Sequence, residues 1–495
     1  MIKDLQYVRP ETEGLSVENI LLFLKEIKRR KINLHSLMIA RRGKILFEGY
    51  YKPFDENFRH RIYSSSKSVV ALAVGKLAGE GRVKLEDKIA DYFPEYKNDV
   101  KDEGIAACTV KDALMMSVSI PYDSYLPLAE DAADWTKSFF TRYNSVKPAG
   151  TIFHYNTSGT FILDVLVEKL TGKTFLEYLR PEFDEIGVSR DVTCVLSPDG
   201  HAWGGSGVML TLRDFAKIGE LILNKGAAGG KQILPRRYME EMTSVRIANL
   251  DDNECSGLGN YGYGYQLWIT ESGYATYGMG SQMVYCFPDK EFMVVCQGDT
   301  QRACDTAPKD IYWLVSDILY SALKENALPT DDESFSELER VKENLELEKD
   351  FGKNHSPFEK ELSGKEYVLS ENPMGWKRFR FDFCSEQGTL TYENARGVKE
   401  ITFGLGNFIK GTFPETHYYD LQVNKPSMRE PDALFIANFT EEKKLLLRNY
   451  ITDTNFGNCF MTFGFKGKEV GLLFNKRAEF FMDDYCGFAA GKIKE

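Results

Sequence analysis

Ser64 and Lys67 stand three residues apart in the run Tyr63-Ser64-Ser65-Ser66-Lys67. On a helix, residues at positions i and i+3 lie on one face, with Cβ atoms roughly 5–6 Å apart. A lysine in that position can take the proton of the serine, and a helix N-terminus favours the negative charge that develops during acyl transfer. A chain of 495 residues should contain about two S-x-x-K matches by chance, so the surroundings of the pair must decide its meaning.

The residues that follow the pair predict a buried helix. The run from Val69 to Ala78 is apolar apart from Gly75 and Lys76, and the glycines at 79 and 81 suit a helix C-terminus. A helix that is apolar nearly all round is buried rather than lying on a surface. Lys67 at the start of such a helix would be poorly solvated, and burial favours the neutral amine that a general base requires.

A serine–lysine pair also needs a proton relay and a second oxyanion donor. Tyr155 stands in a turn-like run, 148–159, directly before an apolar stretch that begins at Phe161. Taken alone, such a tyrosine is more often a packing aromatic than a catalytic residue, and His154 beside it is more often structural than a base. The aromatic residues at 261, 263, 265 and 268 have two readings, lining of a cleft or packing under a loop.

The elements around these residues predict an α/β (α+β) domain over residues 1–325. Ser16 suits an N-cap, and the apolar residues from Ile20 to Ile27 have helical spacing. Segments 37–40 and 45–47 predict a hairpin, 283–287 and 292–297 predict two more strands, and 311–323 predicts a closing amphipathic helix. The expected fold is an antiparallel sheet made from both ends of the segment, flanked by helices, with a helical insert between.

The remainder of the chain changes character twice. Residues 326–358 are dense in charge and predict a linker with one solvated helix that carries Leu338, Val341 and Leu345. From 359 to 495 the apolar period becomes two, which predicts an antiparallel β-barrel or sandwich. The predicted strands lie at 378–383, 389–392, 400–405, 433–439, 444–451, 459–465 and 470–474.

Composition narrows the classes of function. The net charge is −11 without any basic stripe, which argues against nucleic acid as a partner. No apolar run reaches membrane-spanning length and the first residues lack an apolar signal core, so we expect a cytoplasmic protein without a membrane partner. The nine cysteines show no C-x-x-C pair and the six histidines no metal spacing, so we expect no disulfide framework, metal or cofactor. The oligomeric state is left open.

Together these segments resemble the serine β-lactamase-like hydrolases, the superfamily of class C β-lactamases, D-alanyl-D-alanine peptidases and related esterases and amidases. Ser64 to Lys67 matches its S-x-x-K motif, Tyr155 the tyrosine of its Y-x-N motif, and 278–282 a later block. The resemblance implies that Ser64 is the acylated nucleophile, Lys67 its base and Tyr155 the proton relay, with the backbone N–H groups of Ser64 and Ser281 as the oxyanion hole. The C-terminal region resembles the lipocalin-like domains often appended to this family.

Two departures from the family pattern bear on the substrate. The tyrosine motif continues as Asn156-Thr157, so either Thr157 stands in the asparagine position or Asn156 fills that role from beside it. The third motif, usually K-T-G or H-x-G, reads Gly278-Met279-Gly280 and lacks a cation. We take these five residues as candidate substrate contacts. A missing cation disfavours carboxylate substrates and favours an esterase or small-amide hydrolase. A β-lactamase or D-amino-acid peptidase, and a non-catalytic binding protein that retains the fold, stay open as alternatives.

Overall fold

The structure is a computed structural model that describes residues 6–100, 102–124, 133–250, 258–301, 307–478, 482 and 484–494. The chain forms two compact units. Unit 1 comprises residues 1–300, 304–347 and 422–424, and unit 2 comprises 301–303, 348–421 and 425–495. Seven cysteines within the described ranges are free thiols, while Cys255 and Cys304 lie outside them. None of the helices described is long and apolar enough to cross a membrane.

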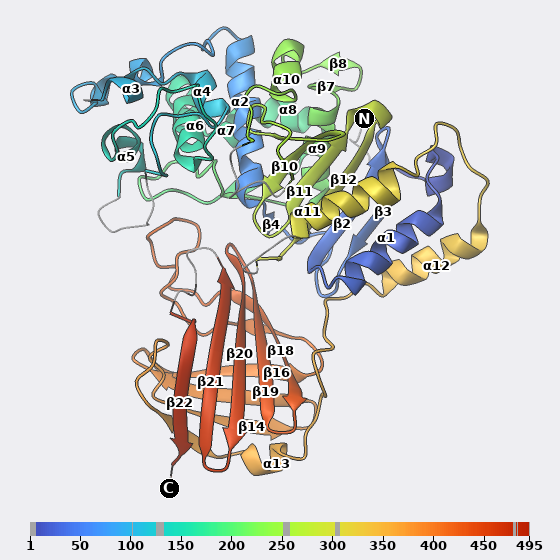
Figure 1. The fold of residues 1–495 in the computed structure, drawn as a ribbon, viewed down its shortest axis with the longest axis vertical. Coiled ribbons are helices and arrows are strands. Elements are labelled where there is room, and N and C mark those ends of the chain that lie inside the picture. The colour runs from blue at the N-terminus through green and yellow to red at the C-terminus, as the bar shows by residue number, and fades with distance from the viewer. Residues whose placement is uncertain are drawn as a thin grey trace. The chain divides into compact units, whose positions relative to one another are not determined.

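Unit 1 contains a seven-stranded sheet in the order β1-β3-β2-β12-β11-β10-β9 (Figure 1). Neighbouring strands are antiparallel except for β1, which pairs in parallel with β3. The predicted α/β domain with an antiparallel sheet made from both ends of the segment is therefore confirmed. Its strands are β1 (Gln6–Tyr7), β2 (Leu34–Arg41), β3 (Lys44–Tyr50), β9 (Trp268–Thr270), β10 (Gly273–Gly278), β11 (Gln282–Phe287) and β12 (Phe292–Gly298).

Helices from both ends of unit 1 pack together beside the sheet. They are α1 (Val17–Arg29), α11 (Ala307–Leu314) with its π-helical continuation Val315–Tyr320, and α12 (Asp332–Glu343). The sequence predicted a solvated helix in the region of α12, whereas α12 packs against α1 and β3. Its apolar side supplies the reason, because Leu338 at its centre is only 1% exposed.

The helical insert is built around α2 (Ser66–Gly79), which Figure 1 shows between the sheet and the other helices of the insert. Nearly every residue of α2 is buried, as its all-round apolar character predicts. It packs against α6 (Thr157–Thr171), while α9 (Leu212–Leu223) packs against β11 and β12. The insert also contains α3 (Glu103–Ala106), α4 (Val110–Leu114), α5 (Trp135–Thr141), α7 (Phe175–Tyr178), α8 (Arg180–Glu185), α10 (Arg236–Met242), a small sheet of β4 (His60–Arg61), β5 (Thr193–Cys194) and β6 (Val208–Leu210), and the hairpin β7 (Ala227–Ala228) and β8 (Lys231–Gln232).

Unit 2 has ten strands, of which nine form a closed barrel while the tenth, Ile409–Thr412, pairs with the strand Asp432–Glu441, and this confirms the predicted all-β antiparallel domain. The closure is made by a parallel pairing of β16 with β18. Large aromatic side chains such as Trp376, Phe381 and Phe463 fill the interior, which is a packed core. Its elements are α13 (Glu359–Leu362), β13 (Glu366–Leu369), β14 (Arg378–Cys384), β15 (Gln387–Asn394), β16 (Gly397–Leu405), β17 (Ile409–Thr412), β18 (Asp432–Glu441), β19 (Lys444–Thr452), β20 (Phe456–Lys466), β21 (Glu469–Ala478) and β22 (Gly487–Ile493). The lipocalin likeness stays a prediction.

Candidate active site

The structure brings Ser64 and Lys67 into contact. A 3-10 turn, Tyr63–Ser65, leads directly into α2 at Ser66, so the helix begins two residues later than Ser64. The Nζ of Lys67 lies 3.0 Å from the Oγ of Ser64 and donates a second bond to the carbonyl of Gly205 at 2.6 Å. Lys67 is 1% exposed, while Ser64 is partly open to solvent. The pair therefore has the proximity that proton transfer requires.

The other serines in the first turn of α2 have structural partners. Ser65 donates to the carbonyl of Gln282 at 2.7 Å, and Ser68 donates to the carbonyl of Gln266 at 2.7 Å. The hydroxyl of Ser66 accepts the N–H of Val208 at 3.1 Å. These bonds fasten the start of α2 to three different segments. They leave Ser64, with its neighbouring amine and its open side, as the candidate nucleophile.

Tyr155 lies beside the same lysine. Its ring centroid is 5.1 Å from the Nζ of Lys67, and the ring stacks on that of Trp268 at 5.8 Å with 19° between the planes. Trp268 is itself buried and contacts Tyr263 edge-on. The aromatic residues at 263 and 268 therefore pack beneath Tyr155 and fix the orientation of its ring.

Asn156 and Thr157, the two candidates for the asparagine role of the tyrosine motif, lie at the N-terminus of α6. Asn156 is the N-cap and accepts the N–H of Gly159 at 3.0 Å with its buried side chain. Thr157 is half-buried and faces Gly205, because a Cβ placed on that glycine would meet the Thr157 methyl at 2.4 Å. Asn156 has a capping role, and Thr157 is the one beside the carbonyl that holds Lys67. Substrate contact by either residue stays a prediction.

The turn between β10 and β11 lies next to the segment that carries Ser64. A Cβ on Gly278 would lie 2.2 Å from the carbonyl oxygen of Ile62, so the two backbones touch. Tyr63 and Ser281 both have positive φ values, +44° and +73°. Such backbone costs roughly 1–3 kcal/mol per residue and clusters at active sites. The strained positions flank the place where an oxyanion hole formed by Ser64 and Ser281 would lie, and that role stays a prediction.

Side chains behind this turn fix its shape. The amide of Gln282 donates to the carbonyls of Met279 at 3.1 Å and Gly298 at 2.6 Å. The buried hydroxyl of Ser281 bonds to that of Thr300 at 2.8 Å, so the Ser281 side chain points away from the turn into the core. Met279 is partly exposed and brings no positive charge.

The sequence did not assign two residues that the structure places at the site. Gly205 contributes a backbone carbonyl, whose only trace in the sequence is the run Gly204 to Gly207. Asp123 accepts the N–H of Ser158 at 2.8 Å at the start of α6. Burial raises the pKa of Asp123, and the bond from Ser158 acts in the opposite direction. Within the described ranges, no three His, Cys, Asp or Glu side chains are grouped to hold a metal ion.

Comparisons with known proteins identify the family. A sequence profile of the Beta-lactamase family matches residues 25–296, more than half of the chain, and the chain therefore belongs to that family. The 6-aminohexanoate-dimer hydrolase of Paenarthrobacter ureafaciens is 28% identical over 255 residues, which cover 48% of this chain and 64% of that protein. Protein flp of Staphylococcus aureus strain MW2 is 27% identical over 160 residues, or 29% of this chain and 31% of that protein.

Solved structures share the fold. A family VIII carboxylesterase aligns with a TM-score of 0.50 and 17% identity, over 64% of this chain and 99% of that chain. A penicillin-binding protein homolog from Caulobacter crescentus aligns with a TM-score of 0.50 and 16% identity, over 62% and 97% of the two chains. At these identities the likeness concerns the fold alone.

Proposed function

We propose that the protein is a serine hydrolase that forms a covalent acyl-enzyme on Ser64, most favourably with esters or small amides. The observation that carries this proposal is the 3.0 Å distance between the Nζ of a buried Lys67 and the Oγ of a partly exposed Ser64. A serine is a weak nucleophile until a neighbouring base removes its proton. A lysine enclosed by protein at hydrogen-bond distance meets that need.

The reaction proceeds in two halves. Lys67 takes the proton of Ser64 as its oxygen attacks the substrate carbonyl carbon, and the backbone N–H groups of Ser64 and Ser281 stabilise the resulting oxyanion. The tetrahedral intermediate collapses, the bond to the alcohol or amine breaks, and Tyr155 relays to that leaving group the proton that Lys67 took from Ser64. Water then attacks the acyl-enzyme, releases the carboxylic acid and restores the hydroxyl of Ser64.

The substrate class follows from charge. Gly278-Met279-Gly280 offers no cation to a substrate carboxylate, so a substrate without a carboxylate loses no binding energy at this position. The named activity of the Paenarthrobacter relative is hydrolysis of a 6-aminohexanoate dimer, which supports the amide arm of the proposal. Hydrolysis of β-lactams or D-amino-acid peptides is the second candidate, and it rests on the shared fold and the same serine–lysine pair.

A fluorophosphonate probe tests the nucleophile. We expect wild type to be labelled at Ser64 and Ser64→Ala to remain unlabelled, because the probe requires an activated hydroxyl. Lys67→Ala should also lose labelling while it remains folded, since groups that act as one unit fail together. The matched control is Ser68→Ala, which removes a neighbouring hydroxyl with a structural partner and should keep the labelling. Labelling of the Ser64→Ala protein at the wild-type rate would overturn the proposal.

A further inference from the structure

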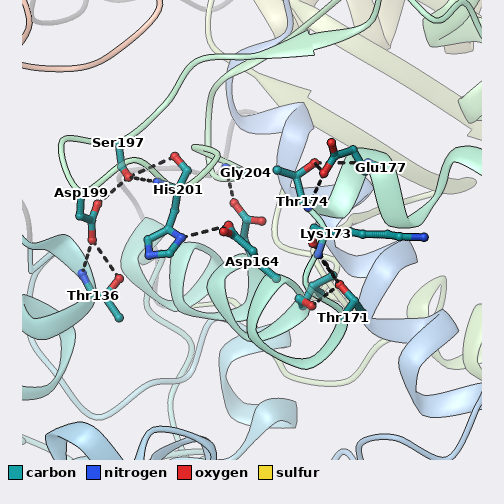
Figure 2. A network of polar contacts seen from close by, with 12 residues as sticks. Thr136, Asp164, Thr171, Lys173, Thr174, Glu177, Ser197, Asp199, His201 and Gly204 are labelled. Atoms are coloured by element: carbon teal, nitrogen blue, oxygen red, sulfur yellow. Dashed lines mark hydrogen bonds and ion pairs between the residues drawn. The ribbon is translucent and has the colours of Figure 1, made fainter.

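Asp164 is a carboxylic acid buried in the interior of unit 1. It lies on α6 between Leu163 and Val165 and is 0% exposed. Its Oδ2 accepts the N–H of Gly204 at 3.0 Å, as Figure 2 shows. Its Oδ1 is buried and has no hydrogen-bond partner among the described residues. Burial raises the pKa of Asp164 well above its usual range. Burying a polar group without all its hydrogen bonds lowers the free energy of unfolding, so a function for Asp164 is sought in its bond to Gly204.

The helical period places Asp164 on the face of α6 that meets the active-site loop. Thr157 and Asp164 are seven residues apart, two turns of one helix face. Thr157 lies against Gly205, and Asp164 binds Gly204, so this face contacts two consecutive residues of the loop. Further along, Glu168 bonds to the ring of His201 at 3.0 Å. Figure 2 shows Asp164 reaching from α6 to Gly204, with His201 to one side of it.

The loop of residues 203–207 is held by contacts to α2, to α6 and to Arg61. A Cβ on Gly204 would lie 2.4 Å from the Cγ2 of Val70 on α2 and 2.9 Å from the Oδ2 of Asp164. On the far side, the buried guanidinium of Arg61 donates to the carbonyl of Ser206 at 2.8 Å. Between these anchors the carbonyl of Gly205 accepts the bond from Lys67 at 2.6 Å. The bond that Asp164 accepts from Gly204 therefore acts two peptide units before the carbonyl that orients the lysine.

We propose that Asp164 is a positioning residue: by holding the N–H of Gly204 it fixes the Gly205 carbonyl and so aims the amine of Lys67 at Ser64. The inference rests on the proposed function. The same helix begins two residues after Tyr155, so α6 sets the positions of the proton relay and, through Asp164, of the base. A hydrogen-bond acceptor is what the position requires, and an amide oxygen can replace the carboxyl oxygen there.

The experiment compares Asp164→Asn, Asp164→Ala and Thr160→Val with wild type. Asparagine keeps an acceptor for Gly204, while alanine removes it. Thr160→Val is the control for lost packing of α6, because it deletes a buried bond to Gln266 at 2.7 Å and leaves Gly204 untouched. Three quantities are measured for each protein: deuterium exchange of residues 203–207, titration of the Lys67 amine by NMR with 13C-labelled lysine, and the pH dependence of fluorophosphonate labelling.

We expect Asp164→Ala to exchange faster at 203–207 and to label about 100-fold more slowly, the size of loss that a displacement of about 1 Å produces. Its Lys67 titration should shift relative to wild type, and the acid limb of the labelling profile should shift with it. Asp164→Asn should restore all three readouts toward wild type. Thr160→Val should lower the melting temperature and leave the Lys67 titration in place.

An Asp164→Ala protein with wild-type exchange and titration would overturn the inference. An Asp164→Asn protein that fails as fully as Asp164→Ala would overturn it too, because an acceptor would then be insufficient. Exchange and titration need no turnover, so they decide the role of Asp164 separately from the proposed function. If wild type escapes labelling, the hydrolase proposal fails, while a titration shift in Asp164→Ala still supports the positioning role.

Discussion

Among single residues, we expect Met279 to have the largest bearing on substrate choice. It is partly exposed in a turn whose backbone is fixed by Gln282 and lies beside the Ser64 segment through Gly278. A charge-assisted hydrogen bond to a substrate carboxylate is worth roughly 1.5–3 kcal/mol, or about one to two decades in kcat/KM. An uncharged ester loses nothing where that bond is absent. The residue at 279 should therefore set the ratio between neutral and anionic substrates.

Met279→His should raise kcat/KM for nitrocefin more than for a short-chain p-nitrophenyl ester, because the imidazolium can meet the β-lactam carboxylate. In wild type, the ester should be the better substrate. The measurement is kcat/KM for both substrates in both proteins, with Met279→Leu as the control that changes shape without adding charge. Nitrocefin as the better wild-type substrate would restore the β-lactamase reading.

At the scale of elements, α6 packs closely against the loop 203–207 because Gly204 and Gly205 have no side chains. A methyl group on Gly205 would lie 2.4 Å from the Cγ2 of Thr157, while its other neighbours are at ordinary contact distance, 3.5 Å or more. We expect Gly205→Ala to displace the carbonyl that holds Lys67 and to slow fluorophosphonate labelling by about 100-fold. Thr157→Ser removes the opposing methyl, so the double variant Gly205→Ala, Thr157→Ser should recover most of the rate.

The control for this pair is Thr157→Ser alone, which should label at close to the wild-type rate. Melting temperatures of all four proteins separate a lost fold from a displaced carbonyl. A double variant as slow as Gly205→Ala would show that the clash with Thr157 is not the cause. A wild-type rate in Gly205→Ala would show that the loop tolerates the shift.

The strands β2 and β4 meet at a buried pair of histidines. The Nδ1 of His35 lies 2.8 Å from the Nε2 of His60, and burial lowers the pKa of His60 from 6.5 to about 3. The unfolded chain binds a proton at this residue below pH 6.5 and the native state does not, so stability is present above that pH and is lost as pH falls. Between pH 7 and pH 5 the loss from His60 should be roughly 2 kcal/mol.

Urea unfolding of wild type and His60→Gln at the two pH values tests this linkage. Wild type should lose roughly 2 kcal/mol more than the variant on going from pH 7 to pH 5. The carboxylates titrate in both proteins, so their contribution to the change in unfolding free energy cancels in the comparison. Equal losses in the two proteins would exclude His60 as a source of acid sensitivity.

The elements also show where sequence reasoning succeeds and where it stops. The Ser64 helix was predictable because its apolar run and the S-x-x-K spacing are both local. β22 was not predicted, since Phe488 points outward at 73% exposure and the strand pairs on one side with β13, which is distant in sequence. The role of the Gly205 carbonyl was not predicted, because every residue has a backbone carbonyl and the residue type does not show which one binds a side chain.

On the scale of the whole molecule, the two units have separate cores. The main cluster of unit 2 contains residues from Phe358 to Ala489 and none from unit 1. The candidate site of Ser64, Lys67, Tyr155 and Gly205 lies entirely within unit 1. In the segment that joins the two cores, the N–H of Leu347 bonds to the carbonyl of Lys52 in unit 1, and the N–H of Lys353 bonds to the carbonyl of Phe439 in unit 2. The chain passes from one core to the other over residues 348–352.

We expect each unit to fold on its own because each buries its apolar side chains with its own residues. A fragment of residues 348–495, which holds unit 2 apart from 301–303 and also carries 422–424, should unfold cooperatively with urea. A fragment of residues 1–347, which holds unit 1 apart from 422–424, should be labelled by fluorophosphonate at Ser64. Limited proteolysis of the full chain should cut first within 326–358, because exposed linkers are the preferred sites of nicking. The matched control is Ser64→Ala in the fragment of residues 1–347, which should remain unlabelled. If the fragment of residues 1–347 is folded by circular dichroism yet unreactive, unit 2 contributes to the chemistry, and the assignment of the whole site to unit 1 fails.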